Sequence, residues 1–189
     1  MDKTWHPIVD YSACTECGFC GCDCGTSTAK SVLVEYLYLD LNTCDRCIGT
    51  DQELVDVMAV LTPALQLAGN EVEYRKVEMS TAELAQQYRF LSSPTIRVNG
   101  LDIGGPVKEN DCGCCGEISG TDVDCRVWEV EGQTYEVPPK ELLAEEILRA
   151  VFGKTEGGCG CGAYEIPKNL KTFYEGKDRS DCSCGGACD

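Results

Sequence analysis

Cysteine constrains this chain more than any other feature of its sequence, because 16 of its 189 residues are thiols and they fall in groups. Grouped cysteines in a reducing cytosol indicate metal, cluster or redox chemistry more often than structural disulfides. The fold must therefore bring thiols together around ions or around a redox site. The groups are Cys14, Cys17, Cys20, Cys22 and Cys24; Cys44 and Cys47; Cys112, Cys114 and Cys115; Cys125; Cys159 and Cys161; Cys182, Cys184 and Cys188.

The charge of the chain restricts its partners. With 16 Lys and Arg against 32 Asp and Glu, the formal net charge is −16. Such a surface repels phosphate backbones and anionic lipids, so we expect no nucleic acid and no membrane as partner. The first residues lack the apolar region of a secretory signal, and the longest apolar stretch is too short to cross a bilayer, which predicts a cytoplasmic protein. An acidic carrier suits a disulfide-containing or metal-exchanging protein partner.

The single histidine, His6, narrows the possible chemistry further. Ser-His-Asp, Cys-His and multi-histidine zinc enzymes all need imidazole groups that this chain does not supply. We therefore expect the function of the chain to depend on the chemistry of its thiols.

The pattern of apolar residues and turns predicts three parts. Residues 1–29 form a cysteine-rich metal-binding segment, residues 30–153 a folded domain with an insertion at 105–137, and residues 154–189 a cysteine-rich tail. A capping box of Thr50 and Glu53 predicts that the first helix of the domain starts after the Cys44–Cys47 loop. Strands are expected at 31–40, 71–79, 93–98, 101–103, 125–130 and 133–137, and helices at 50–68, 81–90 and 139–152.

This order of elements resembles the thioredoxin fold, through the strand–Cys-x-x-Cys–helix unit at Cys44 and Cys47 and the proline-led strand at Ser93 and Pro94. Residues 39–44 and 112–115 look closest to an uncharacterised thioredoxin-like family of prokaryotes. The resemblance implies an α/β fold with a thioredoxin-like central mixed sheet, flanking helices and cysteine-rich N- and C-terminal segments. It also implies a cis-proline facing the dithiol. The chain departs from thioredoxin by its insertion, by Asp45-Arg46 between the cysteines, and by a helix expected to begin beyond Cys47, which weakens the helix dipole at the thiols.

Two functions are open for the central pair. In one, Cys44 is a nucleophile, Cys47 resolves it, and Pro94 with Ser93 shapes the contact with an incoming disulfide or metal. In the other, the pair is buried or holds a metal on a fold that has lost redox activity.

The N-terminal group resembles one half of a bacterial ferredoxin, because Cys14, Cys17, Cys20 and Cys24 have the spacing that wraps a 4Fe-4S cluster. Gly25 replaces the ferredoxin proline, and Cys22 is an additional thiol. A zinc knot and an open thiol arm are the alternatives.

The insertion and the tail carry the remaining thiols. Cys112, Cys114 and Cys115 on a glycine-rich loop could surround a soft ion such as arsenite, mercuric or cuprous ion, or could form a structural zinc site completed by Cys125. The tail cysteines have the Cys-x-Cys spacing of metallothionein-like clusters, or are thiols that bind adventitious metal; they are Cys159, Cys161, Cys182, Cys184 and Cys188. Between them, residues 164–174 are amphipathic enough for a short helix or docking segment.

Three functional hypotheses follow from the sequence. The first is a thiol–disulfide oxidoreductase with an associated iron–sulfur or metal site that relays electrons to Cys44 and Cys47. The second is a protein that binds or detoxifies thiophilic metals and metalloids such as mercury, arsenic, copper or zinc. In it Cys44, Cys47 and the 112–115 loop are ligands, and the two cysteine-rich ends are thiol arms. The third is a structural metalloprotein scaffold.

Overall fold

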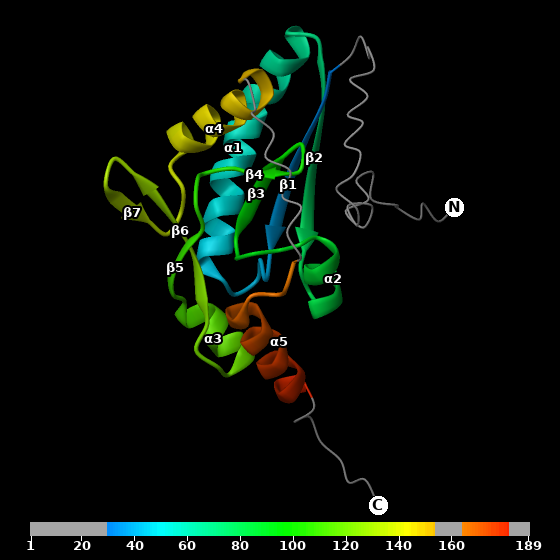
Figure 1. Cartoon of the computed structure of the whole chain (residues 1–189). Helices are drawn as coiled ribbons and strands as arrows, with labels where there is room; N and C mark the ends of the chain where they lie inside the picture. The colour runs from blue at the N-terminus through cyan, green and yellow to red at the C-terminus, as the bar shows by residue number, and fades with distance from the viewer. Residues whose placement is uncertain (1–29, 154–163, 182–189) are drawn as a thin grey trace, which may run out of the picture.

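A buried strand, β1 (Lys30–Tyr38), forms the centre of the fold, and every side chain from Val32 to Leu37 along it is buried. The computed structural model describes residues 30–153 and 164–181. In it β1 pairs in parallel with β2 (Asn70–Glu78) and antiparallel with β3 (Thr95–Val98), and β4 (Leu101–Asp102) completes a mixed sheet of order β2-β1-β3-β4 (Figure 1). The predicted α/β class with a central mixed sheet and flanking helices is confirmed.

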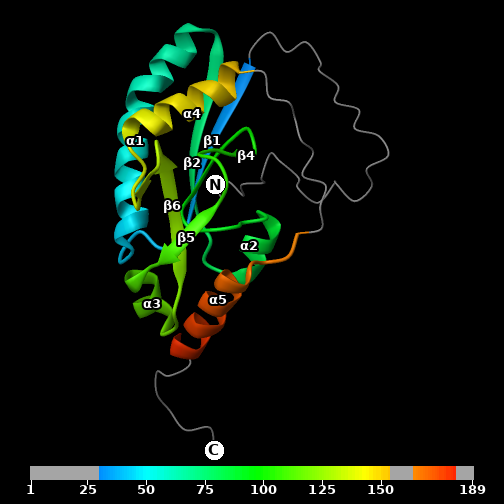
Figure 2. The ribbon, with the colours of Figure 1, turned by 60° about the vertical axis from the view of Figure 1, so that its left-hand side comes forward.

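Two helices pack together on one side of this sheet, α1 (Asp45–Leu67) and α4 (Lys140–Phe152) (Figures 1 and 2). Their apolar faces meet the sheet in one hydrophobic core, to which α1 contributes Leu54 and Leu61 and α4 contributes Leu143 and Ile147. The short helix α2 (Ala82–Gln87) lies on the other side of the sheet (Figures 1 and 2). Burial of these aliphatic side chains stabilises the fold by about 1.5–3 kcal/mol each.

The start of α1 corrects the sequence analysis. The helix begins at Asp45, and Cys44 is its N-cap, whereas the capping box predicted a start near Thr50. Thr50 is instead a buried residue inside the helix. The prediction is wrong because the first turn of α1 is held by contacts with the insertion, a segment that is distant in the sequence. Cys44 therefore occupies the positive end of a helix dipole.

Both predicted hairpin turns are confirmed. Asn99 and Gly100 have φ angles of 52° and 80°, as the turn between β3 and β4 requires, and the Asn99 side chain also accepts a hydrogen bond from Leu33 N at 2.9 Å. Glu131 and Gly132, with φ angles of 50° and 81°, join β6 (Asp124–Val130) to β7 (Gln133–Tyr135).

The insertion forms a second sheet of order β5-β6-β7, in which β5 (Lys108–Asp111) pairs antiparallel with β6. The glycine-rich sequence predicts a loop at the cysteines of the insertion, but the structure contains a short helix there, α3 (Gly113–Ser119). Gly113 is the first residue of this helix and Gly120 is its C-cap, so two of the glycines that suggest a flexible loop lie at the ends of the helix.

The final helix, α5 (Lys168–Asp181), packs against α3 (Figures 1 and 2). Leu170 and Phe173 on its inner face are fully buried. The predicted helix in the amphipathic segment after residue 164 is thus confirmed, and it serves to cover the insertion.

Among residues 30–153 and 164–181, no helix is both long and apolar enough to cross a bilayer. The predicted N-terminal segment lies wholly outside the described residues, and the predicted tail lies partly outside them.

Candidate metal centre

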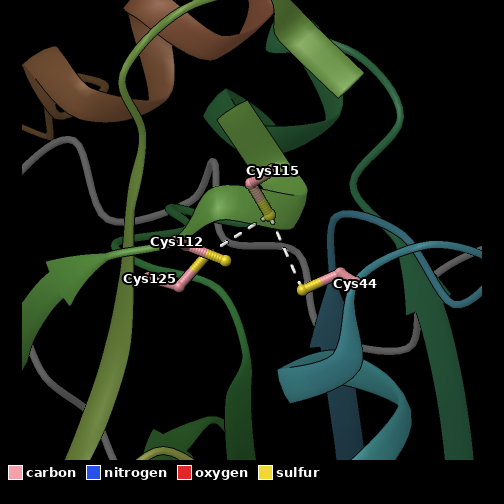
Figure 3. Close-up of side chains that lie close together, drawn as sticks. All are labelled: Cys44, Cys112, Cys115 and Cys125. Atoms are coloured by element: carbon pink, nitrogen blue, oxygen red, sulfur yellow. Dashed lines mark hydrogen bonds between the residues drawn. The ribbon is translucent and has the colours of Figure 1, made fainter. Parts of the chain in front are cut away.

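Four buried thiols meet at the junction of α1 with the insertion (Figure 3). The Sγ atoms of Cys44, Cys112, Cys115 and Cys125 all lie within 4.8 Å of one another. Cys115 Sγ is 3.6 Å from Cys44 Sγ and 3.3 Å from Cys125 Sγ. A tetrahedral ion with metal–sulfur bonds of about 2.3 Å has sulfur–sulfur edges of about 3.8 Å, so the group has nearly the size of a four-thiolate metal site.

Local hydrogen bonds place the first thiol. Asp40 Oδ1 accepts from Asn42 N at 2.8 Å and from Thr43 N at 2.5 Å, which turns the chain sharply after β1. Cys44 follows that turn with extended backbone angles, and its carbonyl accepts the first helical hydrogen bond from Ile48 N. The Cys44 side chain therefore points from the N-terminus of α1 toward the insertion (Figure 3).

The insertion supplies the other three thiols from one helix and one strand. Cys112 is the N-cap of α3, and Cys115 lies in its first turn. Cys112 N donates to Val123 O at 2.8 Å, which ties the start of α3 to the chain just before β6. Cys125 lies on β6 opposite Asn110 of β5. The side chains from α3 and β6 converge on one point, where Cys44 joins them (Figure 3).

Arg46 fastens α1 to the insertion beside this point. Arg46 is only 7% exposed, and its guanidinium donates to three backbone carbonyls and to the carboxylate of Glu136. The carbonyls belong to Cys125 at 3.2 Å, Asn110 at 3.2 Å and Asp111 at 2.5 Å. Arg46 thereby positions the strand that carries Cys125.

The fifth buried thiol, Cys47, lies next to the group but is not part of it. Its Sγ is 3.3 Å from Ser93 Oγ, and Ser93 Oγ also accepts from Leu39 N at 3.1 Å. The Ser93–Pro94 peptide bond is cis, as the thioredoxin resemblance implies. Ser93 O accepts a hydrogen bond from Arg126 N at 2.7 Å, so the backbone next to the cis-proline is paired with β6 of the same chain.

The thiols compete for their protons. Hydrogen bonding with Cys112, and then with Cys115 and Cys125, lowers the pKa of Cys44 strongly. Hydrogen bonding with Cys115 and Cys125 lowers the pKa of Cys112 to about 7. The pKa values of Cys115 and Cys125 are raised, mainly because each shares a hydrogen bond with Cys112. Four thiolates at this spacing need a cation among them, and a divalent ion supplies that charge.

The structure groups the predicted residues differently from the sequence analysis. It joins Cys112, Cys115 and Cys125 of the proposed zinc site with Cys44 of the proposed dithiol. Cys114 lies outside this group, half-buried, with Sγ 3.7 Å from Asp45 Oδ2. The hypothesis of a thiophilic-metal protein places Cys44 and the 112–115 loop among the ligands, but it also includes Cys47, which the structure leaves outside the group. The signal that connects the two segments is the repeated Cys-x2-Cys spacing at 44–47 and 112–115, which is typical of paired ligands to one ion.

The remaining predicted ligands lie outside the described residues. They are Cys14, Cys17, Cys20, Cys22, Cys24, Cys159, Cys161, Cys182, Cys184 and Cys188.

Comparison with known proteins identifies relatives for the part of the chain that contains this site. Residues 32–147 match the family described as "Domain of unknown function (DUF2703)". An "Uncharacterized protein" of Archaeoglobus fulgidus is 31% identical over 110 residues, which cover 57% of this chain and 77% of that protein. No solved structure matches the chain. All four grouped thiols lie inside the matched residues. The chain therefore belongs to the family described as Domain of unknown function (DUF2703).

Proposed function

We propose that this chain binds a thiophilic metal ion, with Zn²⁺ as the best match, through Cys44, Cys112, Cys115 and Cys125. The observation that carries the proposal is the convergence of these four buried Sγ atoms within 4.8 Å of one another. A buried thiol forms only weak hydrogen bonds, so it stabilises the fold less than a buried hydroxyl does. Four thiols in contact are also costly to ionise, because the thiolates repel one another. Coordination of a cation removes both disadvantages.

The number and type of ligands favour zinc among the soft ions. Zn²⁺ takes four thiolates in a tetrahedron, and a closed four-cysteine set is typical of structural sites. Arsenite needs three thiolates and cuprous or mercuric ions two or three, so each of these leaves at least one buried thiol without a role. The thiols come from α1, α3 and β6, so the ion would link the insertion to the central domain.

Thiol–disulfide exchange on a thioredoxin-like fold is the second candidate function. It is supported by the position of Cys44 at a helix N-terminus, by the neighbouring thiol of Cys47, and by the cis peptide bond before Pro94. Both thiols, however, are 0% exposed, and β6 already pairs with Ser93 O. A protein disulfide would have to displace the insertion to reach Cys44, which is why metal binding is the first proposal.

A 4Fe-4S cluster on Cys14, Cys17, Cys20 and Cys24 would supply electrons to the dithiol if the second function holds. A net charge of −16 favours cationic metal donors or basic proteins as exchange partners.

The test of the metal site uses a full-length chain in which the ten cysteines outside the described residues are serine. It keeps the six thiols at 44, 47, 112, 114, 115 and 125. This six-cysteine chain is purified without oxygen, loaded with Zn²⁺ and analysed for bound zinc. Co²⁺ is then substituted, because four thiolates around Co²⁺ give an intense tetrahedral visible spectrum.

We expect one ion per chain, lost in Cys125→Ser and retained in Cys114→Ser, the matched control from the same insertion. Equal loss in both variants, or no stoichiometric ion in the parent, would contradict the proposal. The second function is measured on the same proteins by reduction of insulin disulfides. Turnover that disappears in Cys44→Ser and persists in Cys125→Ser would make disulfide exchange the leading function.

A further inference from the structure

Cys47 is a buried nucleophile to which the proposed metal site gives no role. Its side chain is 0% exposed and lies outside the four-thiol group. Its Sγ lies 3.3 Å from the Ser93 hydroxyl, and the thiol also interacts with the Cys44 thiol and with the backbone of Asp40. Tyr36 OH donates to the Cys47 carbonyl at 2.7 Å and fixes this turn of α1 against β1. Cys47 is thus a thiol held beside one of the four ligands.

The helix brings Cys44 and Cys47 to the same face. Residues three apart in a helix have Cβ atoms about 5–6 Å apart, and the flanking N-cap position allows the small backbone shift that a disulfide needs. The two residues share one helical turn, from the N-cap Cys44 to the third helical residue. Cys112 and Cys115 have the same spacing on α3, but both belong to the four-thiol group. Among the described residues, Cys44 is therefore the one ligand whose partner at this spacing on its own helix is a thiol outside the group.

We propose that the metal centre is redox-gated: a peroxide joins Cys44 to Cys47 as a disulfide, and the ion leaves because it loses one of its four ligands. This inference rests on the proposed function, since it assigns a regulation to the same site. It goes beyond a structural zinc site because it makes occupancy depend on oxidant. The three thiols of the insertion remain, but they no longer enclose the ion.

The reaction needs only a peroxide as co-reactant. The Cys44 thiolate attacks one peroxide oxygen, the O–O bond breaks, hydroxide leaves, and Cys44 becomes a sulfenic acid. The Cys47 sulfur then attacks the Cys44 sulfur, an S–S bond forms, and the S–O bond breaks as the Cys47 proton and the hydroxyl leave as water. The two sulfurs lose two electrons in total and the peroxide gains them. A phosphine reductant returns both thiols and restores the ligand.

A small oxidant fits the burial of the site. Cys44 has no exposed surface, so a protein disulfide cannot reach it. Hydrogen peroxide is small enough to reach it through small local fluctuations of the structure. Cys47 needs no access from solvent, because it acts on the neighbouring sulfur.

The experiment follows zinc release from the full-length six-cysteine chain after addition of hydrogen peroxide, with a chromogenic zinc chelator. The variant Cys47→Ser keeps all four proposed ligands and a hydrogen-bonding group toward Ser93, and Cys47→Ala checks that the serine hydroxyl has no effect of its own. Cys114→Ser is the matched control for removal of a thiol. After alkylation and trypsin digestion, mass spectrometry locates disulfides. Because Arg46 lies between the two cysteines, cleavage there leaves their peptides joined by the disulfide alone.

We expect the parent and Cys114→Ser to release zinc together with formation of the 44–47 disulfide. Both Cys47 variants should bind zinc equally well but release it at least about tenfold more slowly, because an intramolecular thiol has a high effective concentration. Equal release rates in parent and Cys47→Ser, or a disulfide between Cys115 and Cys125 instead, would overturn the gate and leave the metal site standing. Absence of bound zinc before peroxide is added would overturn the proposed function itself.

Discussion

Replacing Arg46 by methionine tests the link between α1 and the insertion. The guanidinium donates to three carbonyls and to Glu136, and methionine keeps much of the side-chain volume while removing every donor. The Cys125 carbonyl is buried, so leaving it without a partner costs about 1–3 kcal/mol. The carbonyls of Asn110 and Asp111 lie nearer the surface and can bind water, so each loss costs about 0.5–1.5 kcal/mol.

The ion pair contributes less than these hydrogen bonds. Glu136 is 60% exposed, which limits its pairing with Arg46 to about 1 kcal/mol. Methionine also avoids the cost of burying a charge, so we expect the free energy of unfolding to fall by about 2–5 kcal/mol. Because Arg46 holds the strand that carries Cys125, zinc affinity should fall as well.

The assay is urea unfolding of the metal-free, reduced protein followed by circular dichroism, with zinc affinity measured by competition with a chelator. The control is Lys108→Met in the same insertion, whose ion pair with Glu129 is exposed on both sides and should be worth less than about 0.5 kcal/mol. If Arg46→Met lowers the free energy of unfolding by no more than this control does, Arg46 does not hold the insertion and the reasoning is refuted.

Three other predictions concern the surroundings of the site. The lowered pKa values of Cys44 and Cys112 mean that the folded, metal-free protein binds fewer protons than the unfolded chain between about pH 7 and 8, so its urea midpoint should rise across this range. Above about pH 9 the midpoint should fall, because Cys47, Cys115 and Cys125, whose pKa values are raised, keep protons that the unfolded chain loses. A midpoint that falls between about pH 7 and 8 would contradict this. Gly104→Ala should destabilise by about 2–4 kcal/mol in the same assay, because φ is +85° and the added carbon would overlap the Trp128 ring; an unchanged midpoint would mean that the ring can move. Phe173→Ala should cost about 3–5 kcal/mol and weaken zinc binding, since Phe173 is fully buried in the core that covers α3; normal zinc affinity would show that α5 does not position the ligands.

Local signals predicted the elements whose stability is local. The strand at β1, the turn at Asn99-Gly100 and the helix α4 each follow from residues within a few positions of one another. The start of α1 was predicted wrongly, because Arg46 and Cys44 fix it through contacts with a segment more than 60 positions away. The helix propensity of the residues near Thr50 carries no information about those distant contacts.

The composition of the four-thiol group depended on the same long-range contact. Cysteine spacing indicated which thiols are close along the chain, and so it paired Cys44 with Cys47. Cys44 and Cys115 are 71 positions apart, and only the docking of the insertion on α1 brings their sulfurs to 3.6 Å. The three ligands inside the insertion, by contrast, were identified together as a candidate zinc set, because they lie near one another in sequence.

This difference in sequence separation assigns the four ligands different roles in folding. Cys115 and Cys125 are 10 positions apart, so an unfolded chain can already bring the ligands of the insertion to one ion. Adding Cys44 closes a loop of 71 positions, which in a chain-entropy model costs the unfolded chain about 4 kcal/mol. In the folded protein the packing of the insertion on α1 already holds this loop closed. An ion held by all four thiols therefore stabilises the docked insertion mainly through its bond to Cys44. Loss of Cys44 from the site, by substitution or by a disulfide with Cys47, would therefore weaken the attachment of the insertion as well as the binding of the ion.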